Sequence, residues 1–177
     1  NINQRPRIKV KKIEFIGNSS VPKKELFQLM VPKTEFLFFL QPGYFKTEEF
    51  ETDLETIRTY YQRKGYLDVK IEPELNYNAD GTEMYIKIKI DEGKKYLVGN
   101  IKISGNEKFP EAQIRNVLRM TSGKPYSEAA MREDVIGIQQ YYFDKGYMNC
   151  DIVPDALLDA ATGDINISYG ITENGLI

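Results

Sequence analysis

The chain has 177 residues, of which 41% are apolar and 12% aromatic, enough to bury one or two compact cores. Its 24 basic and 26 acidic residues leave a formal net charge of -2, so no overall positive field favours binding to nucleic acid. Histidine is absent and Cys150 is the single cysteine, which excludes histidine-based catalytic triads and any disulfide within the chain. This composition weighs against an enzyme.

The first predicted elements in chain order are a strand and a short helix. Residues 7–16 alternate charged and apolar side chains with a period of two, which predicts a strand, and Gly17-Asn18 ends it. Pro22 then opens a helix that runs to Met30, because proline is tolerated in the first turn of a helix.

A longer helix and two more strands follow. Apolar residues recur at helical spacing over residues 47–64, and Gly65 supplies the left-handed residue that ends the helix. Residues 66–72 alternate again and form the second predicted strand, until Pro73 removes a backbone donor, as suits a strand at a sheet edge. After a turn, residues 84–90 alternate in the same way and form the third strand.

The sequence contains an internal repeat. Residues 13–18 (IEFIGN) align with residues 101–106 (IKISGN) at an offset of 88. Residues 60–66 (YYQRKGY) align with residues 141–147 (YYFDKGY) at an offset of 81, so the first copy carries seven extra residues. The match persists to the end of each copy, which indicates a duplicated unit of about 80 to 90 residues.

The repeat predicts the same fold twice. The order strand, helix, helix, strand, strand gives an α+β chain of two tandem β-α-α-β-β domains, residues 1–94 and 95–177, with an apolar insertion near residues 36–42. Each domain is expected to be a three-stranded mixed sheet covered on one face by two helices. If the third strand is central, the second strand lies at an edge and offers unpaired backbone groups to solvent.

Three runs of residues resemble a known family. Residues 13–18, residues 60–66 and the Ile-Asp-Glu-Gly run at 90–93 resemble the polypeptide-transport-associated (POTRA) domain, which is found in arrays before the membrane barrel of outer-membrane assembly proteins. The same features recur in weaker form in the second copy. The resemblance implies a non-catalytic periplasmic module with no cofactor and no metal, from a protein whose adjacent POTRA domains and C-terminal membrane barrel are absent from this chain.

The resemblance also implies how the domains bind. The expected function is a scaffold that receives unfolded outer-membrane proteins by β-augmentation, in which a client adds a strand to an exposed edge, and that docks accessory assembly lipoproteins. Proline in place of Lys70 is expected to remove an edge donor and weaken client binding. The alternative interpretation is a solvated edge guarded by Lys70 and Pro73. The candidate client-binding residues are Tyr66, Asp68, Lys70, Glu72, Tyr147, Asn149 and Asp151.

Two apolar features need a covered position. The insertion is too apolar to lie in water as a loop, so it is expected to pack against its own domain or its neighbour, with a partner or lipid contact as the alternative. Cys150 aligns with Val69 in the repeat and is expected to be a buried, unreactive thiol. The apolar residues of the insertion are Phe36, Leu37, Phe38, Phe39 and Leu40.

Two rival functions stay open at this point. The same domain pair could belong to a two-partner secretion system or to an organelle protein-import channel, which would change the client. An enzyme with a carboxylate or lysine site is disfavoured by the duplication and by the missing histidine. A deep pocket that holds paired acids would support the enzyme, but Asp53 and Glu55 lie two apart on a predicted helix and point to different faces.

Overall fold

The computed structural model describes residues 8–30 and 45–174. The chain divides into two compact units. The predicted insertion near residues 36–42 lies outside the described residues. The first unit comprises Asn1–Tyr61 and Asp68–Lys94, and the second comprises Gln62–Leu67 and Lys95–Ile177.

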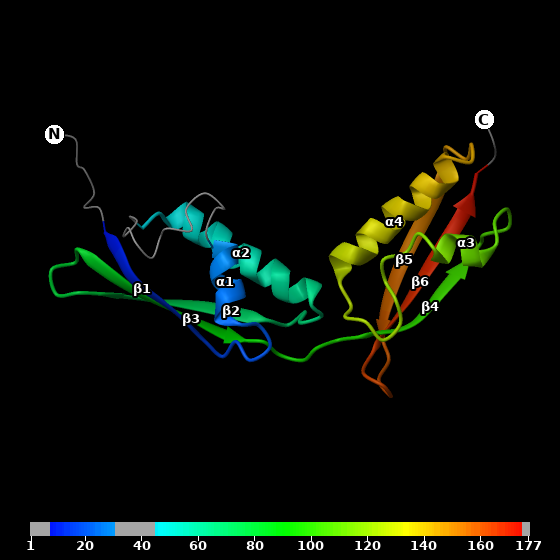
Figure 1. The fold of residues 1–177 in the computed structure, drawn as a ribbon. Coiled ribbons are helices and arrows are strands. Elements are labelled where there is room, and N and C mark those ends of the chain that lie inside the picture. The colour runs from blue at the N-terminus through cyan, green and yellow to red at the C-terminus, as the bar shows by residue number, and fades with distance from the viewer. Residues whose placement is uncertain (1–7, 31–44, 175–177) are drawn as a thin grey trace. The chain divides into compact units, whose positions relative to one another are not determined.

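The first unit is a three-stranded sheet with two helices on one face (Figure 1). The central strand β3 pairs in parallel with β1 and antiparallel with β2, so the strand order is β1-β3-β2. The elements are β1 (Lys9–Ile16), α1 (Lys23–Met30), α2 (Thr47–Arg63), β2 (Lys70–Tyr77) and β3 (Glu83–Asp91).

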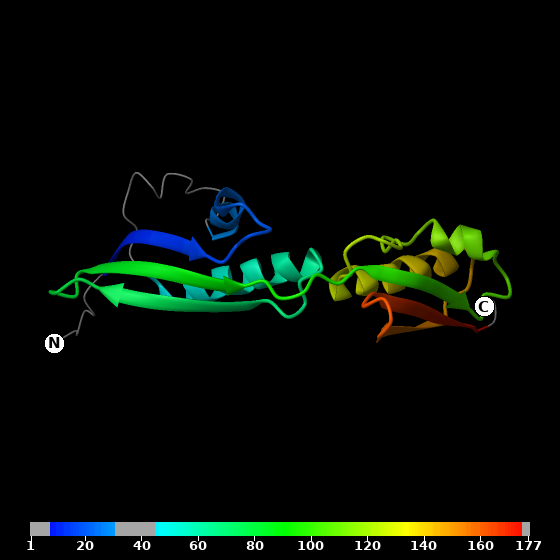
Figure 2. The same cartoon turned by 90° about the horizontal axis from the view of Figure 1, so that it is seen from below.

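The second unit repeats this topology. Its central strand β6 pairs in parallel with β4 and antiparallel with β5, and the helices again lie on one side of the sheet (Figure 2). The predicted α+β fold of two β-α-α-β-β units is therefore confirmed. The elements are β4 (Val98–Ser104), α3 (Glu111–Arg115), α4 (Glu128–Phe143), β5 (Cys150–Leu158) and β6 (Ile165–Glu173).

The limits of the second strand differ from the prediction. The strand expected at residues 66–72 runs instead over Lys70–Tyr77, and its counterpart begins at Cys150. Lys70 pairs with Asp91, the last residue of β3, so residues before Lys70 have no partner strand to pair with. The strand also continues past Pro73, which pairs with Ile88.

The central strands explain why one face of each sheet is covered. Alternate residues of β3 are buried and the residues between them are exposed or half-buried, and β6 shows the same alternation. Burying one large apolar side chain, such as the isoleucines of these strands, stabilises the fold by about 1.5–3 kcal/mol. The buried residues are Met84, Ile86, Ile88 and Ile90 in β3, and Ile165, Ile167, Tyr169 and Ile171 in β6.

The glycine that ends the first strand of each unit lies against the central strand. Gly17 and Gly105 have φ of +90° and +80°, a left-handed conformation that glycine adopts without steric cost. A Cβ at Gly17 would lie 2.1 Å from the Ile90 carbonyl oxygen, and one at Gly105 would lie 2.0 Å from that of Ile171. A side chain at either position would clash with the central strand, which accounts for the glycine, and the asparagine that follows it donates to a carbonyl of the next turn, Val21 or Phe109.

A tyrosine and a glutamate connect the long helix to the sheet in both units. The Tyr61 hydroxyl of α2 donates to Glu92 Oε1 at 2.9 Å, just beyond β3, and the Tyr142 hydroxyl of α4 donates to Glu173 Oε1 at 2.6 Å. Both tyrosines are fully buried. Burial, and then the Glu173 carboxylate beside it, raise the pKa of Tyr142, so the phenol stays protonated and remains a donor.

The same glutamates hold the turn after the first strand. Glu92 accepts the Ser20 N–H at 2.8 Å, and Glu173 accepts the Lys108 N–H at 3.0 Å. Each carboxylate therefore joins the turn, the end of the central strand and the long helix. The tyrosine and the glutamate each recur at the offset of 81 residues found in the sequence repeat.

Replacing Tyr142 by phenylalanine removes the hydroxyl but keeps the buried ring. Because a hydrogen bond to a charged acceptor contributes about 1.5–3 kcal/mol, Tyr142→Phe is expected to lower the free energy of unfolding by roughly that amount in urea titrations. Tyr141→Phe is the matched control, since the Tyr141 hydroxyl donates to Gln113 in an exposed contact. Equal losses for the two variants would contradict the role assigned to the Tyr142–Glu173 bond.

Candidate functional site

The second strand of each unit, β2 or β5, forms one edge of its sheet. Among the described residues, no strand is hydrogen-bonded to the outer side of β2 or of β5. Such an edge leaves backbone N–H and C=O groups open to another extended chain. The second-strand edges expected from the sequence are present in both units.

Backbone bonds at the two hairpins establish which groups face outward. The Asn78 N–H donates to the Glu83 carbonyl at 3.0 Å, and the Asp159 N–H donates to the Asp164 carbonyl at 2.8 Å. Along an antiparallel strand, the backbone N–H and C=O groups of successive residues point alternately toward the paired strand (inward) and away from it (outward). Counting toward the N-terminus from Asn78 and from Asp159, every second residue therefore points its backbone groups at the central strand. The outward residues are Ile71, Pro73, Leu75 and Tyr77 in β2, and Ile152, Pro154, Ala156 and Leu158 in β5.

The prolines occupy equivalent outward positions. Pro73 and Pro154 pair with Ile88 and Tyr169 of the central strands, and neither has an N–H to give to a ladder. In the outward position a proline breaks no bond within the sheet. It removes one donor from the open edge, which limits unwanted pairing while leaving donors on both sides of it.

The predicted client-binding residues fall into two groups. Tyr66, Asp68, Tyr147 and Asn149 lie in the turns before the strands. Lys70, Glu72 and Asp151 lie in β2 and β5, but their backbone groups face the central strand and only their side chains face solvent. The prediction that Lys70 offers a free edge donor is therefore wrong, because its N–H belongs to the ladder with β3.

A surface pocket with both apolar and polar lining residues lies beside the start of β5, and the sequence analysis did not identify it. Its volume is about 290 Å³, and it is lined by α4 and by the turn into β5. Three of its apolar side chains are more than half exposed: Ile136 at 64%, Phe143 at 53% and Met148 at 52%. We call this the α4 pocket. The lining residues are Ile136, Gln139, Gln140, Phe143, Tyr147, Met148 and Cys150.

The corresponding helix face of the first unit is polar. At the repeat offset of 81, Glu55 and Arg58 take the places of Ile136 and Gln139, and they form an ion pair. Thr59 takes the place of Gln140. The two units thus share a backbone fold and an open edge, but they differ in the side chains of the helix face beside the start of the second strand.

Cys150 is the first residue of β5 and lies at the bottom of this surface. It is 8% exposed, and burial raises the pKa of its thiol to about 11. The thiolate is therefore scarce at neutral pH. The prediction of a buried thiol is confirmed.

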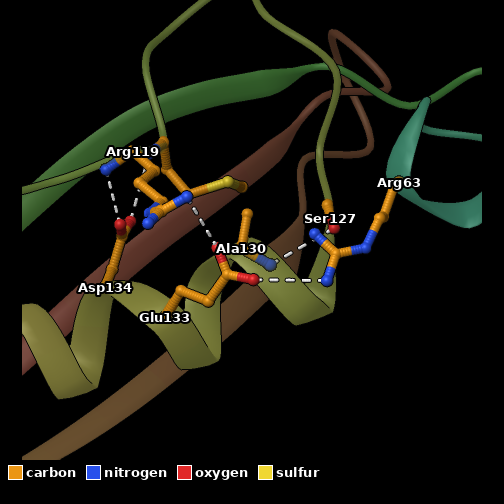
Figure 3. A network of polar contacts seen from close by, with 7 residues as sticks. Arg63, Arg119, Ser127, Ala130, Glu133 and Asp134 are labelled. Atoms are coloured by element: carbon orange, nitrogen blue, oxygen red, sulfur yellow. Dashed lines mark hydrogen bonds and ion pairs between the residues drawn. The ribbon is translucent and has the colours of Figure 1, made fainter.

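The second unit holds one fully buried carboxylate, Asp134 of α4 (Figure 3). It accepts the backbone N–H of Arg119 at 2.5 Å and of Met120 at 3.2 Å, and the Tyr169 hydroxyl at 2.8 Å. Its neighbour Glu133 pairs with the Arg119 side chain. Asp134 thus fastens the segment between α3 and α4 to the helix and to β6.

No helix among the described residues, 8–30 and 45–174, has the length and apolar character needed to cross a membrane. No group of three or more metal-binding side chains lies within reach of one ion in the same residues.

Both units match a known protein family. The family model POTRA, described as surface antigen variable number repeat, matches residues 8–93 and 96–174. A putative outer membrane protein assembly factor of Treponema pallidum is 27% identical over 183 residues, covering 97% of this chain and 20% of that protein. The outer membrane protein assembly factor BamA of Neisseria meningitidis serogroup B is 28% identical over 170 residues, covering 93% and 21%.

A solved structure is similar over the same span. The crystal structure of Haemophilus influenzae BamA POTRA3-5 gives a TM-score of 0.63 at 21% identity, covering 98% of this chain and 70% of that one. The chain belongs to the POTRA family, whose model matches both of its repeats. This family is non-catalytic, which confirms the expectation that the chain is not an enzyme. The chain spans about a fifth of the length of the two curated relatives.

Removing the Asp134 carboxylate tests its structural assignment. Asp134→Ala leaves two backbone amides and the Tyr169 hydroxyl without their acceptor, so the free energy of unfolding is expected to fall by about 3 kcal/mol in urea titrations. Asp144→Ala is the control, because that carboxylate accepts from Gln140 at an exposed site. A loss below about 1 kcal/mol for Asp134→Ala would show that other groups hold this segment.

Proposed function

We propose that this chain belongs to the periplasmic region of a BamA-like outer-membrane assembly factor, where it holds unfolded outer-membrane proteins during barrel insertion. The matching region of its BamA relatives is periplasmic, and those relatives are named as assembly factors. Adjacent POTRA domains and a C-terminal membrane barrel belong to the same proposal, because the chain spans only a fifth of the relatives.

The second unit receives the client in this proposal, by strand addition to β5. The observation that carries it is the combination of an open β5 edge with the α4 pocket beside it. An added strand would gain main-chain hydrogen bonds from the edge and apolar contacts from the pocket. The 9 residues of β5 also match the roughly 9–11 residues with which a barrel strand crosses a membrane.

The first unit has a different role in this proposal. Its helix face carries the Glu55–Arg58 ion pair where the second unit has the α4 pocket. A charged face of this kind suits contacts with folded partners, whose surfaces are polar at the rim. We assign the docking of accessory assembly lipoproteins to this unit.

Proline at an outward position tests strand addition without breaking the sheet. Ala156→Pro removes an outward donor of β5, so binding of a fluorescent peptide copied from a barrel strand is expected to weaken about fivefold, the effect of one hydrogen bond. Leu75→Pro makes the same change at the equivalent position of β2 and is expected to leave the affinity unchanged. Far-ultraviolet circular dichroism checks that both variants stay folded.

The two variants also separate the alternatives. Unchanged affinity in Ala156→Pro would contradict strand addition at β5. If Leu75→Pro weakened binding of the peptide and Ala156→Pro did not, the client site would be assigned to β2 of the first unit.

A further inference from the structure

We propose that the β5 edge selects extended segments that present lysine or arginine in alternation with apolar residues on one face. This inference rests on the proposed strand addition and specifies the class of client. The opposite face of such a segment is apolar throughout.

The open face of β5 carries an alternating row of side chains. Asp151, Val153, Asp155 and Leu157 share this face, because side chains of a strand alternate between its two sides. All are exposed, Val153 at 66% and Leu157 at 64%. We call these residues the β5 row.

The neighbouring strand leaves the acids of the β5 row without a counter-charge. Asp151 is paired with Thr172 and Asp155 with Ser168, both neutral. Asp151 accepts the neutral Asn174 amide at 3.2 Å. Within the described residues neither aspartate forms an ion pair, and the cation nearest to Asp155 in the sheet is Lys102 of β4, one strand further across Ser168. A strand added on the outer side of the edge would place a cation directly beside either aspartate.

The acids on the same face of β2 in the first unit, Glu72 and Glu74, are already compensated. Glu74 of β2 pairs with Lys89 of β3 at 2.9 Å, and this lysine lowers the pKa of Glu74 through its hydrogen bond and charge. Glu72 lies directly opposite the same lysine. The basic central strand of the first unit thus supplies the charges that the neutral face of β6 lacks.

The β5 row determines which side chains are favoured on a strand that pairs with β5. Side chains directly opposite each other on adjacent strands lie about 4.5–5.5 Å apart, and opposite charges there attract while like charges repel. A strand added to β5 is therefore favoured when cations face Asp151 and Asp155 and apolar side chains face Val153 and Leu157. Its other face meets the α4 pocket, where Phe143 and Met148 favour apolar side chains.

Two synthetic peptides of nine residues provide the test. Both carry valine on one face, and the other face alternates leucine with lysine in the first peptide and leucine with glutamate in the second. Titrated into the whole chain and followed by backbone amide shifts, the lysine peptide is expected to bind roughly fivefold or more tightly. The difference is expected to shrink in 1 M salt, where screening extends over about 3 Å.

A charge-reversed variant checks which residues select the peptide. Asp155→Lys is expected to weaken the lysine peptide and strengthen the glutamate peptide. Glu107→Lys is the matched control, because it changes the net charge equally at an exposed loop position outside β5. If Glu107→Lys changed the relative affinity for the two peptides as much as Asp155→Lys does, the inference would be overturned, since the net charge of the chain would then explain the preference.

The outcomes also distinguish this inference from the proposed function. Equal shifts along β5 with both peptides would overturn the charge preference and leave strand addition intact. No shift along β5 with either peptide would overturn both.

Discussion

The contact on which the rest of each unit depends is the hydrogen bond between a buried tyrosine and the glutamate at the end of the central strand. Tyr142 and Glu173 fix α4 over the sheet, and the same carboxylate holds the turn at Lys108. Because the helix is fixed at this point, the chain reverses directly after it and enters β5 beside the last turns of α4. The α4 pocket lies at this reversal, and its apolar side chains distinguish the second unit from the first.

Much of the fold follows from the sequence because its determinants are local or duplicated. The period of two in the strands, the glycines at positive φ and the aligned tyrosines and glutamates recur in both copies, so chance does not explain them. The limits of β2 could not be predicted, since a strand extends only as far as its partner, and the partner's end at Asp91 is a property of the sheet.

The sequence predicts that the second strands are edges, but it does not predict which of their residues point backbone groups outward. The sequence indicates an edge strand, yet which amides face outward depends on the hairpin bonds at Asn78 and Asp159. The α4 pocket did have a signal: Ile136 lies outside the stripe formed by Val135, Ile138 and Tyr142, so α4 is apolar on a second face. Comparing this helix with its polar counterpart in the first copy identifies the difference. Two units of one fold thus differ in function through the side chains beside a shared edge.

The central claim is that β5 is extended by a client strand. Amide hydrogen exchange on the whole chain, with and without an unfolded outer-membrane protein, tests it most directly, since outward amides exchange freely until another strand accepts their hydrogen bonds. The account predicts that Ile152, Ala156 and Leu158 become protected while Ile71 and Leu75 do not. Protection confined to β2, or no protection at β5 when the client is bound, would contradict it.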